Sequence, residues 1–190
     1  MQRRPGVAEK QSITNSFSQL GDFMEHSSAS SPRNESVSIR FAASGDLPAL
    51  VRLINAAFLV EQFVFDGDRI NAEEARAFMD TGKFLLAEDA AGFVGCVYLA
   101  ILEGRGYLGL LAVDPARQGR GLGSRLVTAA EDYFRAGGCS AVDLRVISQR
   151  TPLPPFYRRL GYVEIGTAPF SPSLPTKVPG HYIVMSKPLT

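Results

Sequence analysis

The chain has 190 residues, of which 45% are hydrophobic and 21% are charged, a composition typical of a folded domain. Twenty basic and nineteen acidic residues give a net charge of +1, which excludes a chain-wide field that would steer the protein to nucleic acid or to an anionic membrane. The two cysteines, Cys96 and Cys139, form no C-x-x-C pair, which argues against both a disulfide framework and a metal site.

The first 36 residues differ in composition from the rest of the chain. They are rich in serine, and the run 27–35 has too few apolar side chains to offset the entropy lost on ordering. We therefore expect residues 1–36 to form a flexible N-terminal tail and residues 37–190 to form one domain. No apolar run is long enough for a membrane span, and the N-terminus lacks the apolar segment of a secretion signal, so we expect a cytoplasmic protein.

The first elements of the domain are a strand and two helices. Residues 37–41 alternate like a strand, and Asp46 is placed to cap a helix that has Pro48 in its first turn. Apolar side chains then recur every three or four residues as far as Phe58, which indicates a helix packed on a sheet. After an aperiodic stretch, Asn71 is placed to cap a second helix.

Three strands joined by hairpin turns are predicted next, over residues 84–88, 93–101 and 107–113. A helix over residues 122–136, with an apolar face and a Gly-Gly stop, and a strand over residues 141–147 complete a β-α-β unit. The two strands of such a unit are expected to be parallel neighbours.

A short helix around Tyr157 follows, then a strand over residues 162–167 and a proline-rich loop. A last strand is predicted over residues 181–187. Residues 60–70 and 170–180 show the least regular pattern, so we expect them to contact the molecule on which the protein acts.

The stretch 113–125 joins a predicted strand to a predicted helix and contains Gly119, Gly121 and Gly123. Glycines let the backbone bend tightly and bring several N–H groups close to one anion. The first turn of a helix leaves such groups unpaired and adds a partial positive charge. We interpret the stretch as a phosphate-binding turn. Arg117 and Arg125 are equally well explained as phosphate contacts and as solvated surface charges.

Two common phosphate-binding motifs do not fit this stretch. No lysine follows the glycines, which excludes the phosphate loop of nucleoside triphosphatases. The dinucleotide fingerprint fits poorly, because Leu126 stands where its third glycine or alanine is needed. A dinucleotide-dependent oxidoreductase is therefore a distant alternative.

The segment Gln118-Gly-Arg-Gly121-Leu-Gly123 resembles the acyl-coenzyme A signature Q/R-x-x-G-x-G/A of the GCN5-related N-acetyltransferase (GNAT) superfamily at every fixed position. A second block, Pro154-Pro-Phe-Tyr157-Arg-Arg-Leu-Gly161-Tyr, is similar to the family segment that carries a tyrosine before a strand. The resemblance covers residues 37–187 and implies a single-domain α/β fold. The expected sheet is mixed, with six or seven strands, flanking helices, and a fourth and a fifth strand that splay apart.

The resemblance implies an N-acetyltransferase that moves an acetyl group from acetyl-coenzyme A (acetyl-CoA), its co-substrate, to a primary amine of a small molecule or a peptide, without a metal. A coenzyme A-binding regulatory module that lacks turnover is the alternative. The diphosphate would bind at the glycine turn, and the pantetheine arm along the strand before it. The implied cofactor-binding residues are Leu111, Ala112, Val113, Gln118, Gly119, Arg120, Gly121, Leu122, Gly123 and Ser124.

By the same resemblance, a backbone N–H near Leu111 would stabilise the oxyanion. Tyr157 would lie near the sulfur and protonate the departing thiolate, although a tyrosine at this position can also simply fill the core.

The general base is harder to assign, because many relatives carry a glutamate on the fourth strand where this chain has Gly109. The remaining candidates are Glu61, Asp66, Asp68 and Glu103, each of which is also explained as a solvated surface acid. We take Glu103 as the working hypothesis, although its turn lies at the far end of the strand. Neither nucleic acid nor a membrane is expected as a partner, and an exposed edge strand makes a homodimer plausible.

Overall fold

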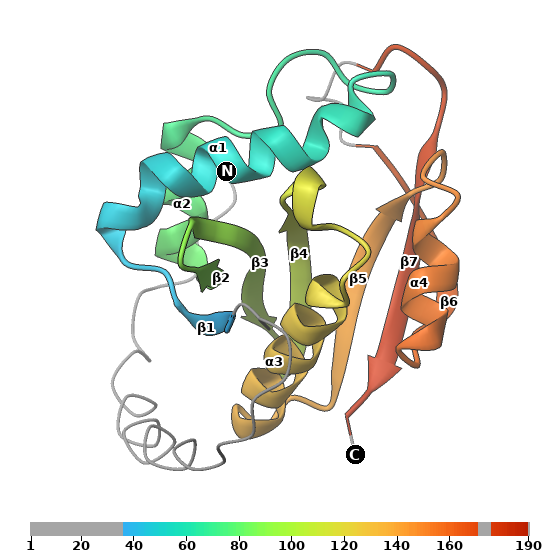
Figure 1. Cartoon of the computed structure of the whole chain (residues 1–190). Coiled ribbons are helices and arrows are strands. Elements are labelled where there is room, and N and C mark those ends of the chain that lie inside the picture. Colours follow the sequence, from blue (N-terminus) through green and yellow to red (C-terminus); the bar gives the residue numbers. More distant parts are fainter. Residues whose placement is uncertain (1–35, 171–175, 190) are drawn as a thin grey trace, which may run out of the picture. The chain divides into compact units, whose positions relative to one another are not determined.

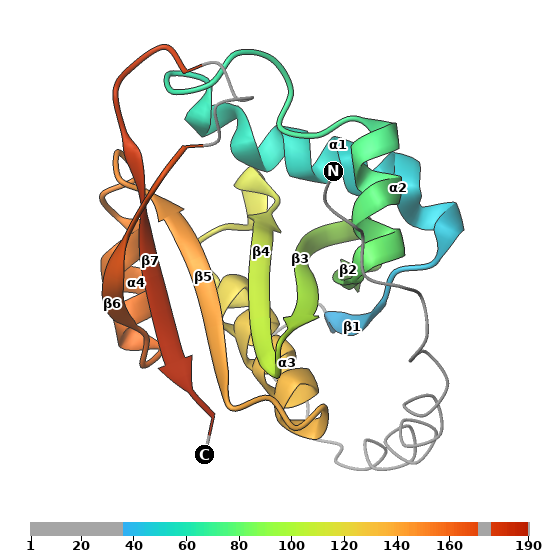
Figure 2. The same cartoon turned by 180° about the vertical axis from the view of Figure 1, so that it is seen from behind.

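Seven strands form one mixed sheet in the order β1-β2-β3-β4-β5-β7-β6, and helices cover it (Figures 1 and 2). The structure is a computed structural model that describes residues 36–170 and 176–189. Apart from Ser36, the predicted tail lies outside the described residues. The single-domain α/β fold with a seven-stranded mixed sheet confirms the expected fold class.

The chain enters the sheet through β1 (Ser38–Phe41), a strand that pairs antiparallel to β2. A 3-10 turn, η1 (Ser44–Asp46), leads into α1 (Leu47–Phe58), whose buried side chains pack on the sheet. A second 3-10 turn, η2 (Leu59–Glu61), extends α1. The next helix is α2 (Ala72–Thr81). Both helices therefore begin where the sequence predicts them.

The two predicted helix caps behave differently. The Asn71 side chain accepts a hydrogen bond from the Glu74 N–H at 2.9 Å, and the Glu74 carboxylate accepts one from the Asn71 N–H at 2.9 Å. This pair is a capping box. Asp46 occupies the N-cap position of α1, but its carboxylate makes no cap hydrogen bond, so the expected cap is wrong. It accepts instead from the Ala43 N–H and the Arg40 guanidinium, which ties α1 to β1.

The middle of the chain forms the centre of the sheet. The strands β2 (Lys83–Asp89), β3 (Gly92–Leu102) and β4 (Arg105–Val113) form an antiparallel meander. After a short turn, η3 (Pro115–Arg117), the helix α3 (Leu122–Ala136) returns the chain to β5 (Ala141–Ile147), a strand parallel to β4. All five predicted elements of this region are confirmed to within two residues at each end.

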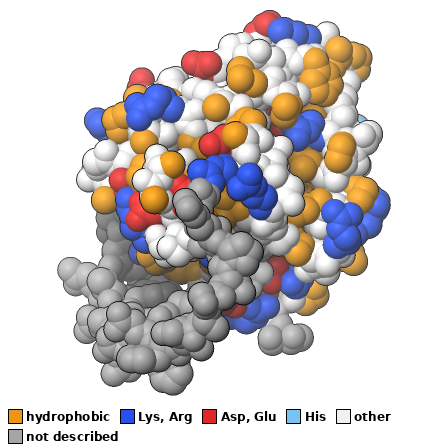
Figure 3. Space-filling model, viewed as in Figure 1, with side chains coloured by type: hydrophobic (Ala, Val, Ile, Leu, Met, Phe, Trp, Pro, Cys, Tyr) orange, Lys and Arg blue, Asp and Glu red, His pale blue; other side chains and the backbone are white. Residues whose placement is uncertain are grey.

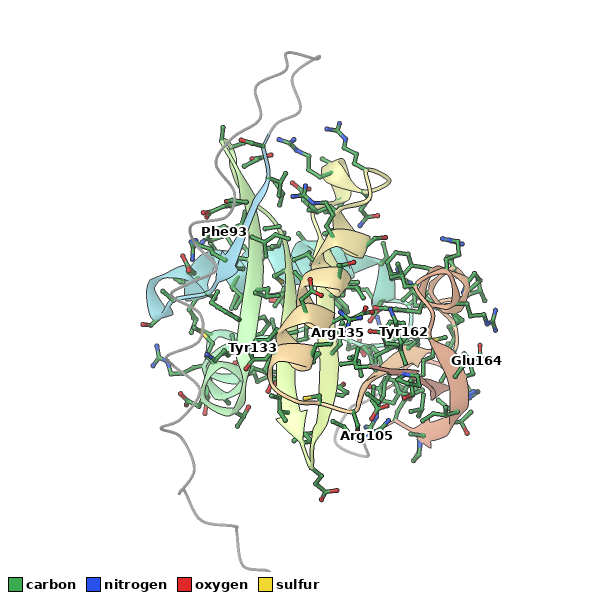
Figure 4. The ribbon with its side chains drawn as sticks, turned by 90° about the horizontal axis from the view of Figure 1, so that it is seen from below. Phe93, Arg105, Tyr133, Arg135, Tyr162 and Glu164 are labelled. Atoms are coloured by element: carbon green, nitrogen blue, oxygen red, sulfur yellow. The ribbon has the colours of Figure 1, made fainter. Side chains whose placement is uncertain are left out.

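The last three elements complete the second half of the sheet. They are α4 (Leu153–Arg159), β6 (Val163–Pro169) and β7 (His181–Pro188). The strand β7 lies between β5 and β6 and is antiparallel to both, which leaves β6 at the edge, where Figure 4 shows Glu164 at the rim of the molecule.

Two irregularities interrupt the sheet near its centre. In the pairing of β3 with β4 the register shifts, so that Leu110 and Leu111 together lie opposite Val97, which makes a β-bulge. Leu110 has a φ of 47°, in the left-handed region. The parallel pairing of β4 with β5 then covers only Gly106–Leu108 on the β4 side. Beyond Leu108 the two strands splay apart, as the family resemblance implies.

The core has two parts on opposite faces of the sheet. One lies beneath α1 and includes Leu50 and Ile54, and the other lies beneath α3 and includes Leu126 and Phe134. On the face shown in Figure 3, acidic and basic side chains are interspersed, in keeping with the small net charge. Among the described residues, no helix is both long enough and apolar enough to span a membrane.

Candidate active site

A cavity of about 630 Å³ opens where β4 and β5 separate. Its lining comes from both strands, from the turn before α3, from α4 and from η2. The cavity therefore lies where the hydrogen bonding between β4 and β5 ends. In Figure 1, β4 and β5 lie apart at their upper ends, above the start of α3.

The glycine turn forms one wall of this cavity. Gly119 and Gly121 each have a φ of 77°, in the left-handed region that favours glycine, and a Cβ added to either would meet no atom within 4 Å. The N–H groups of Leu122, Gly123 and Ser124 belong to the first turn of α3, where no intrahelical acceptor is available. The turn thus offers an open set of backbone donors at the positive end of a helix, which suits a diphosphate.

Eight of the ten cofactor-binding residues implied by the sequence line the cavity. Ala112 does not, because its side chain points into the core beneath α1. Arg120 does not line it either and is exposed. The eight that do are Leu111, Val113, Gln118, Gly119, Gly121, Leu122, Gly123 and Ser124.

The arginines that flank the turn have partners within the protein. Arg117 Nη2 lies 3.0 Å from Asp89 Oδ2, and the Asp89 side chain is 1% exposed. Arg125 donates a hydrogen bond to the Val37 carbonyl at 2.8 Å. Arg117 also lines the cavity, whereas Arg125 does not. The sequence did not distinguish Arg117 from Arg125 as phosphate contacts, whereas the structure places only Arg117 of the two in the cavity lining.

The splayed part of β4 offers a second set of backbone groups. From Gly109 to Val113, the edge of β4 that would face β5 in a complete sheet pairs with none of the described strands. Exposed strand edges bind extended ligands through main-chain hydrogen bonds, and the two amides of a pantetheine arm fit that pattern.

Tyr157 of α4 lines the cavity and is 5% exposed. Its ring is in edge contact with the rings of Phe156 and Tyr162, at centroid distances of 5.0 and 5.7 Å. Burial raises the pKa of the Tyr157 hydroxyl above its usual value. The hydroxyl is therefore protonated at neutral pH and can act as a proton donor.

Glu61 of η2 lines the same cavity and is 6% exposed. Its Oε1 atom lies 3.5 Å from Arg150 Nη1, and its buried Oε2 atom has no hydrogen-bond partner among residues 36–170 and 176–189. Burial raises the pKa of Glu61, and the positive charges of Arg150 and Arg69 partly oppose the shift. A buried carboxylate oxygen without a partner needs an explanation, and a ligand in the cavity provides one.

The other three carboxylates proposed from the sequence are placed elsewhere. Glu103 is exposed in the turn between β3 and β4, with a φ of 51°, at the end of β4 opposite the bulge, and it does not line the cavity. Asp66 is exposed and pairs with Lys177 at 2.7 Å, and Asp68 is exposed beside it. The structure therefore separates Glu103 from Tyr157 and brings Glu61 to the cavity instead.

A splayed parallel strand pair, a bulge on β4 and a glycine turn before α3 define the class of α/β domains that hold an extended acyl carrier between two strands. The model of the Acetyltransferase (GNAT) family matches residues 47–162, more than half of the chain. The chain belongs to this family.

Several curated relatives are mycothiol acetyltransferases. That of Saccharopolyspora erythraea is 35% identical over 136 residues, which cover 69% of this chain and 45% of the relative. That of Actinosynnema mirum is 34% identical over 136 residues, which cover 69% and 46%. The chain thus spans just under half the length of these relatives.

Solved structures of low sequence identity share the fold. The ribosomal-protein-S18-alanine N-acetyltransferase of Escherichia coli is similar with a TM-score of 0.68 at 19% identity, over 82% of this chain and 95% of that one. The protein yncA of Salmonella typhimurium, solved with its cofactor acetyl-CoA, has a TM-score of 0.66 at 20% identity, over 81% and 94%.

Proposed function

We propose that the protein is an N-acetyltransferase that moves the acetyl group of acetyl-CoA to a primary amine. The observation that carries the proposal is that the glycine turn and the open edge of β4 line one cavity together with two buried ionisable side chains, Glu61 and Tyr157. Membership of the acetyltransferase family supports the reaction, and the acetyl-CoA of the similarly folded yncA supports the co-substrate. We place the activity in residues 37–190.

The co-substrate fits the cavity through backbone groups. The N–H groups at the start of α3 bind the diphosphate, and the free edge of β4 pairs with the pantetheine amides. The bulge at Leu110 and Leu111 interrupts the pairing of β4 with β3, and we assign the Leu111 N–H to the carbonyl oxygen of the thioester. In this arrangement the acyl group lies between the glycine turn and η2.

The transfer needs one base and one acid. The amine nitrogen attacks the thioester carbonyl carbon, so that a C–N bond forms and the C–S bond breaks. Glu61 lines the cavity and, in its ionised form, removes a proton from the ammonium of the acceptor, and Tyr157 donates a proton to the departing thiolate. We therefore replace Glu103 by Glu61 as the general base.

Aromatic side chains mark the entrance for the acceptor. The ring of Phe170 lies in edge contact with those of Phe65 and Tyr182, at centroid distances of 5.2 and 4.8 Å. Phe65 also forms an isolated bridge with Thr176. Phe65 and Phe170 belong to the two segments of irregular sequence, residues 60–70 and 170–180. Their contact supports a role of these segments in acceptor binding.

The experiment is an acceptor panel. The release of free thiol from acetyl-CoA is measured with simple amines, amino acids, aminoglycosides, peptides and a mycothiol-related amine, and calorimetry measures the binding of acetyl-CoA and of NAD. We expect acetyl-CoA to bind more tightly than NAD, and at least one amine to release thiol. Tight binding without release from any amine would favour a coenzyme A-binding module, and tighter binding of NAD would favour an oxidoreductase.

A homodimer is a separate proposal. The edge strand β6 exposes Val163 and Ile165, which are 57% and 58% accessible. An edge strand with apolar side chains is a common site of self-association. Sedimentation of the full chain tests it, and a monomer at all concentrations would exclude it.

A further inference from the structure

Three charged side chains from separate segments meet at the η2 end of the cavity. Glu61 belongs to η2, Arg69 precedes α2, and Arg150 lies between β5 and α4, and all three line the cavity. Arg150 is 3.5 Å from Glu61, and the charge of Arg69 also acts on Glu61. Two guanidinium groups thus accompany one carboxylate, so the group of three carries one excess positive charge. Of the acids beside Arg69, Asp66 is paired with Lys177 and Asp68 is exposed.

Two atoms of these three side chains are buried and have no hydrogen-bond partner in the part of the chain that the structure describes. They are Glu61 Oε2 and Arg69 Nε. The Glu61 side chain is more than nine-tenths buried, because only 6% of the residue is exposed. The guanidinium of Arg69 lies over the ring of Phe58, with its Cζ 5.4 Å from the ring centroid, which helps to hold it in place. Buried polar atoms are nearly always paired, so this end of the cavity is preorganised for a polar ligand.

Arg69 is not placed for the phosphates of acetyl-CoA, because its neighbours Ile70 and Ala75 pack on the face of the sheet opposite α3, and Arg150 is paired with Glu61. The glycine turn opens α3, which packs on the face of the sheet that includes Leu126. The turn η2 extends α1, which packs on the opposite face with Leu50 and Ile54. The acetyl group and the pantetheine arm, which lie between the two ends, carry no charge. The unmatched positive charge therefore remains available for the acceptor.

We propose that the acceptor carries a carboxylate beside its amine, as a free α-amino acid does. Arg69 and Arg150 bind the carboxylate, and Glu61 faces the amine. A planar carboxylate matches the fork of donors on a guanidinium. With an α-amino acid bound, its carboxylate and Glu61 offset two of the three positive charges of Arg69, Arg150 and the ammonium, whereas a simple ammonium would leave two of them unmatched. The inference rests on the proposed acetyl transfer and adds the substrate class.

The test compares acceptors that differ only in this charge. The twenty standard L-amino acids are supplied as free acids and as their primary amides, and the release of thiol from acetyl-CoA gives kcat/KM for each. We expect at least one free amino acid to exceed its amide by about tenfold or more. If every amide reacts as well as its free acid, or if no free acid reacts, the inference is overturned.

Substitutions of the two arginines test whether these residues bind the carboxylate of the acceptor. R69M and R150M should each raise KM for the reactive amino acid by about tenfold and change the Kd of acetyl-CoA by less than about twofold. R76M is the matched control, because Arg76 is exposed on α2 and does not line the cavity, and it should change neither value. An unchanged KM in both R69M and R150M, or an equal rise in KM for the amide, would contradict the assignment.

The outcomes separate this inference from the proposed function. Rapid thiol release with amines that lack a carboxylate, at rates equal to those of amino acids, would overturn the substrate class and leave the acetyl transfer standing. Failure of acetyl-CoA to bind, measured by calorimetry without any acceptor, would overturn both.

Discussion

At the scale of single residues, the cavity lining buries two ionisable side chains, and burial favours the neutral form of each. For Tyr157, the neutral form is the one that can donate a proton, so burial prepares it for the role that we propose. For Glu61, the neutral form cannot accept a proton, and the neighbouring Arg150 and Arg69 act against the effect of burial. The activity should therefore depend on pH through Glu61.

The first prediction concerns Glu61→Gln. The base must be ionised to accept a proton, and burial raises the pKa of Glu61 above the value of about 4.3 that is usual for glutamate. We therefore expect kcat/KM to fall as the pH decreases through this raised pKa. The substitution should lower kcat/KM at neutral pH by about a hundredfold and remove this acidic limb. The rate profile over pH, measured with a reactive amine, checks both.

Two further variants serve as the comparison for Glu61. Glu73→Gln changes an exposed acid in the first turn of α2 and should leave the profile unaltered. Loss of activity in Glu103→Gln together with full activity in Glu61→Gln would restore the assignment made from the sequence and refute ours.

The second prediction concerns Tyr157→Phe. The ring contacts with Phe156 and Tyr162 remain, so the free energy of unfolding should change little. Without the proton donor, kcat should drop by about ten- to a hundredfold, while the Kd of acetyl-CoA stays the same. Steady-state kinetics and calorimetry measure the two quantities.

Tyr162→Phe provides the control for this change. Tyr162 is buried and is not part of the cavity lining, and Figure 4 shows it beside Arg135 of α3. Its substitution should leave kcat unchanged. An equal loss of kcat in both variants would point to packing rather than to proton transfer.

At the scale of elements, the start of α3 does most to define the site, and Gly123 allows a clean test of it. A Cβ on Gly123 would lie 3.6 Å from Phe156 Cζ and 3.9 Å from Val113 Cγ2, which are ordinary contacts. Gly123→Ala should therefore fold, and alanine favours the helix by up to about 1 kcal/mol.

The third prediction follows from this geometry. The added methyl group lies on the residues that line the cavity and crowds the phosphate-binding turn, so the Kd of acetyl-CoA should rise by about tenfold. Calorimetry measures it, with Gly45→Ala as the control, because Gly45 lies in η1 with no atom within 4 Å of an added Cβ. A folded Gly123→Ala protein with unchanged affinity would argue against phosphate binding at this turn.

The capping box of α2 yields a fourth prediction. Asn71→Ala removes the side chain that accepts from the Glu74 N–H and should lower the free energy of unfolding by about 1 kcal/mol. Because Asn71 does not line the cavity, kcat/KM should not change. Urea denaturation measures the stability, with the exposed Arg76→Ala in the same helix as the control. Equal stabilities of the two variants would show that the cap contributes nothing.

At the scale of the whole molecule, the two halves of the sheet are joined below the splay by a polar cluster. Arg105 of β4 donates to both carboxylate oxygens of Asp143 on β5, each at 2.6 Å, and to the Ser186 hydroxyl on β7 at 3.0 Å. This hydrogen bonding with Arg105 lowers the pKa of Asp143. The cluster thus spans three neighbouring strands at the closed end of the cavity.

The fifth prediction concerns this cluster and pH. A carboxyl whose pKa is lower in the folded state stabilises the protein above its unfolded pKa of about 3.9, and the contribution is lost as the pH falls through the folded value. Asp143→Asn should therefore be less stable than the parent at neutral pH, by a modest amount because the pair is partly exposed. The difference should vanish in strong acid. Thermal unfolding across pH checks this, and a difference that stays constant with pH would refute it.

Some features of the sheet could be predicted from neighbouring residues in the sequence, and others depend on contacts between distant parts of the chain. The ends of β2, β3, β4 and α3 are predicted to within two residues. Their signals are the apolar pattern of the strands, the helical periodicity of α3 and its Gly-Gly stop, and each of these lies within a short stretch of sequence. The insertion of β7 between β5 and β6 has no such signal, since it depends on which strand edges remain free once the chain has folded.

For the candidate site, the glycine turn, the residues around it and Tyr157 could be predicted from the sequence, because each belongs to a short motif whose chemistry depends on local spacing. The preference for Glu61 over Glu103 as the proposed base comes from the folded chain, since burial and a place in the cavity lining are properties of the packed structure. Arg69 and Arg150 lie in irregular segments and carry no motif. They become part of the site because folding brings η2, the chain before α2 and the β5–α4 connection together at the end of two strands that no longer pair.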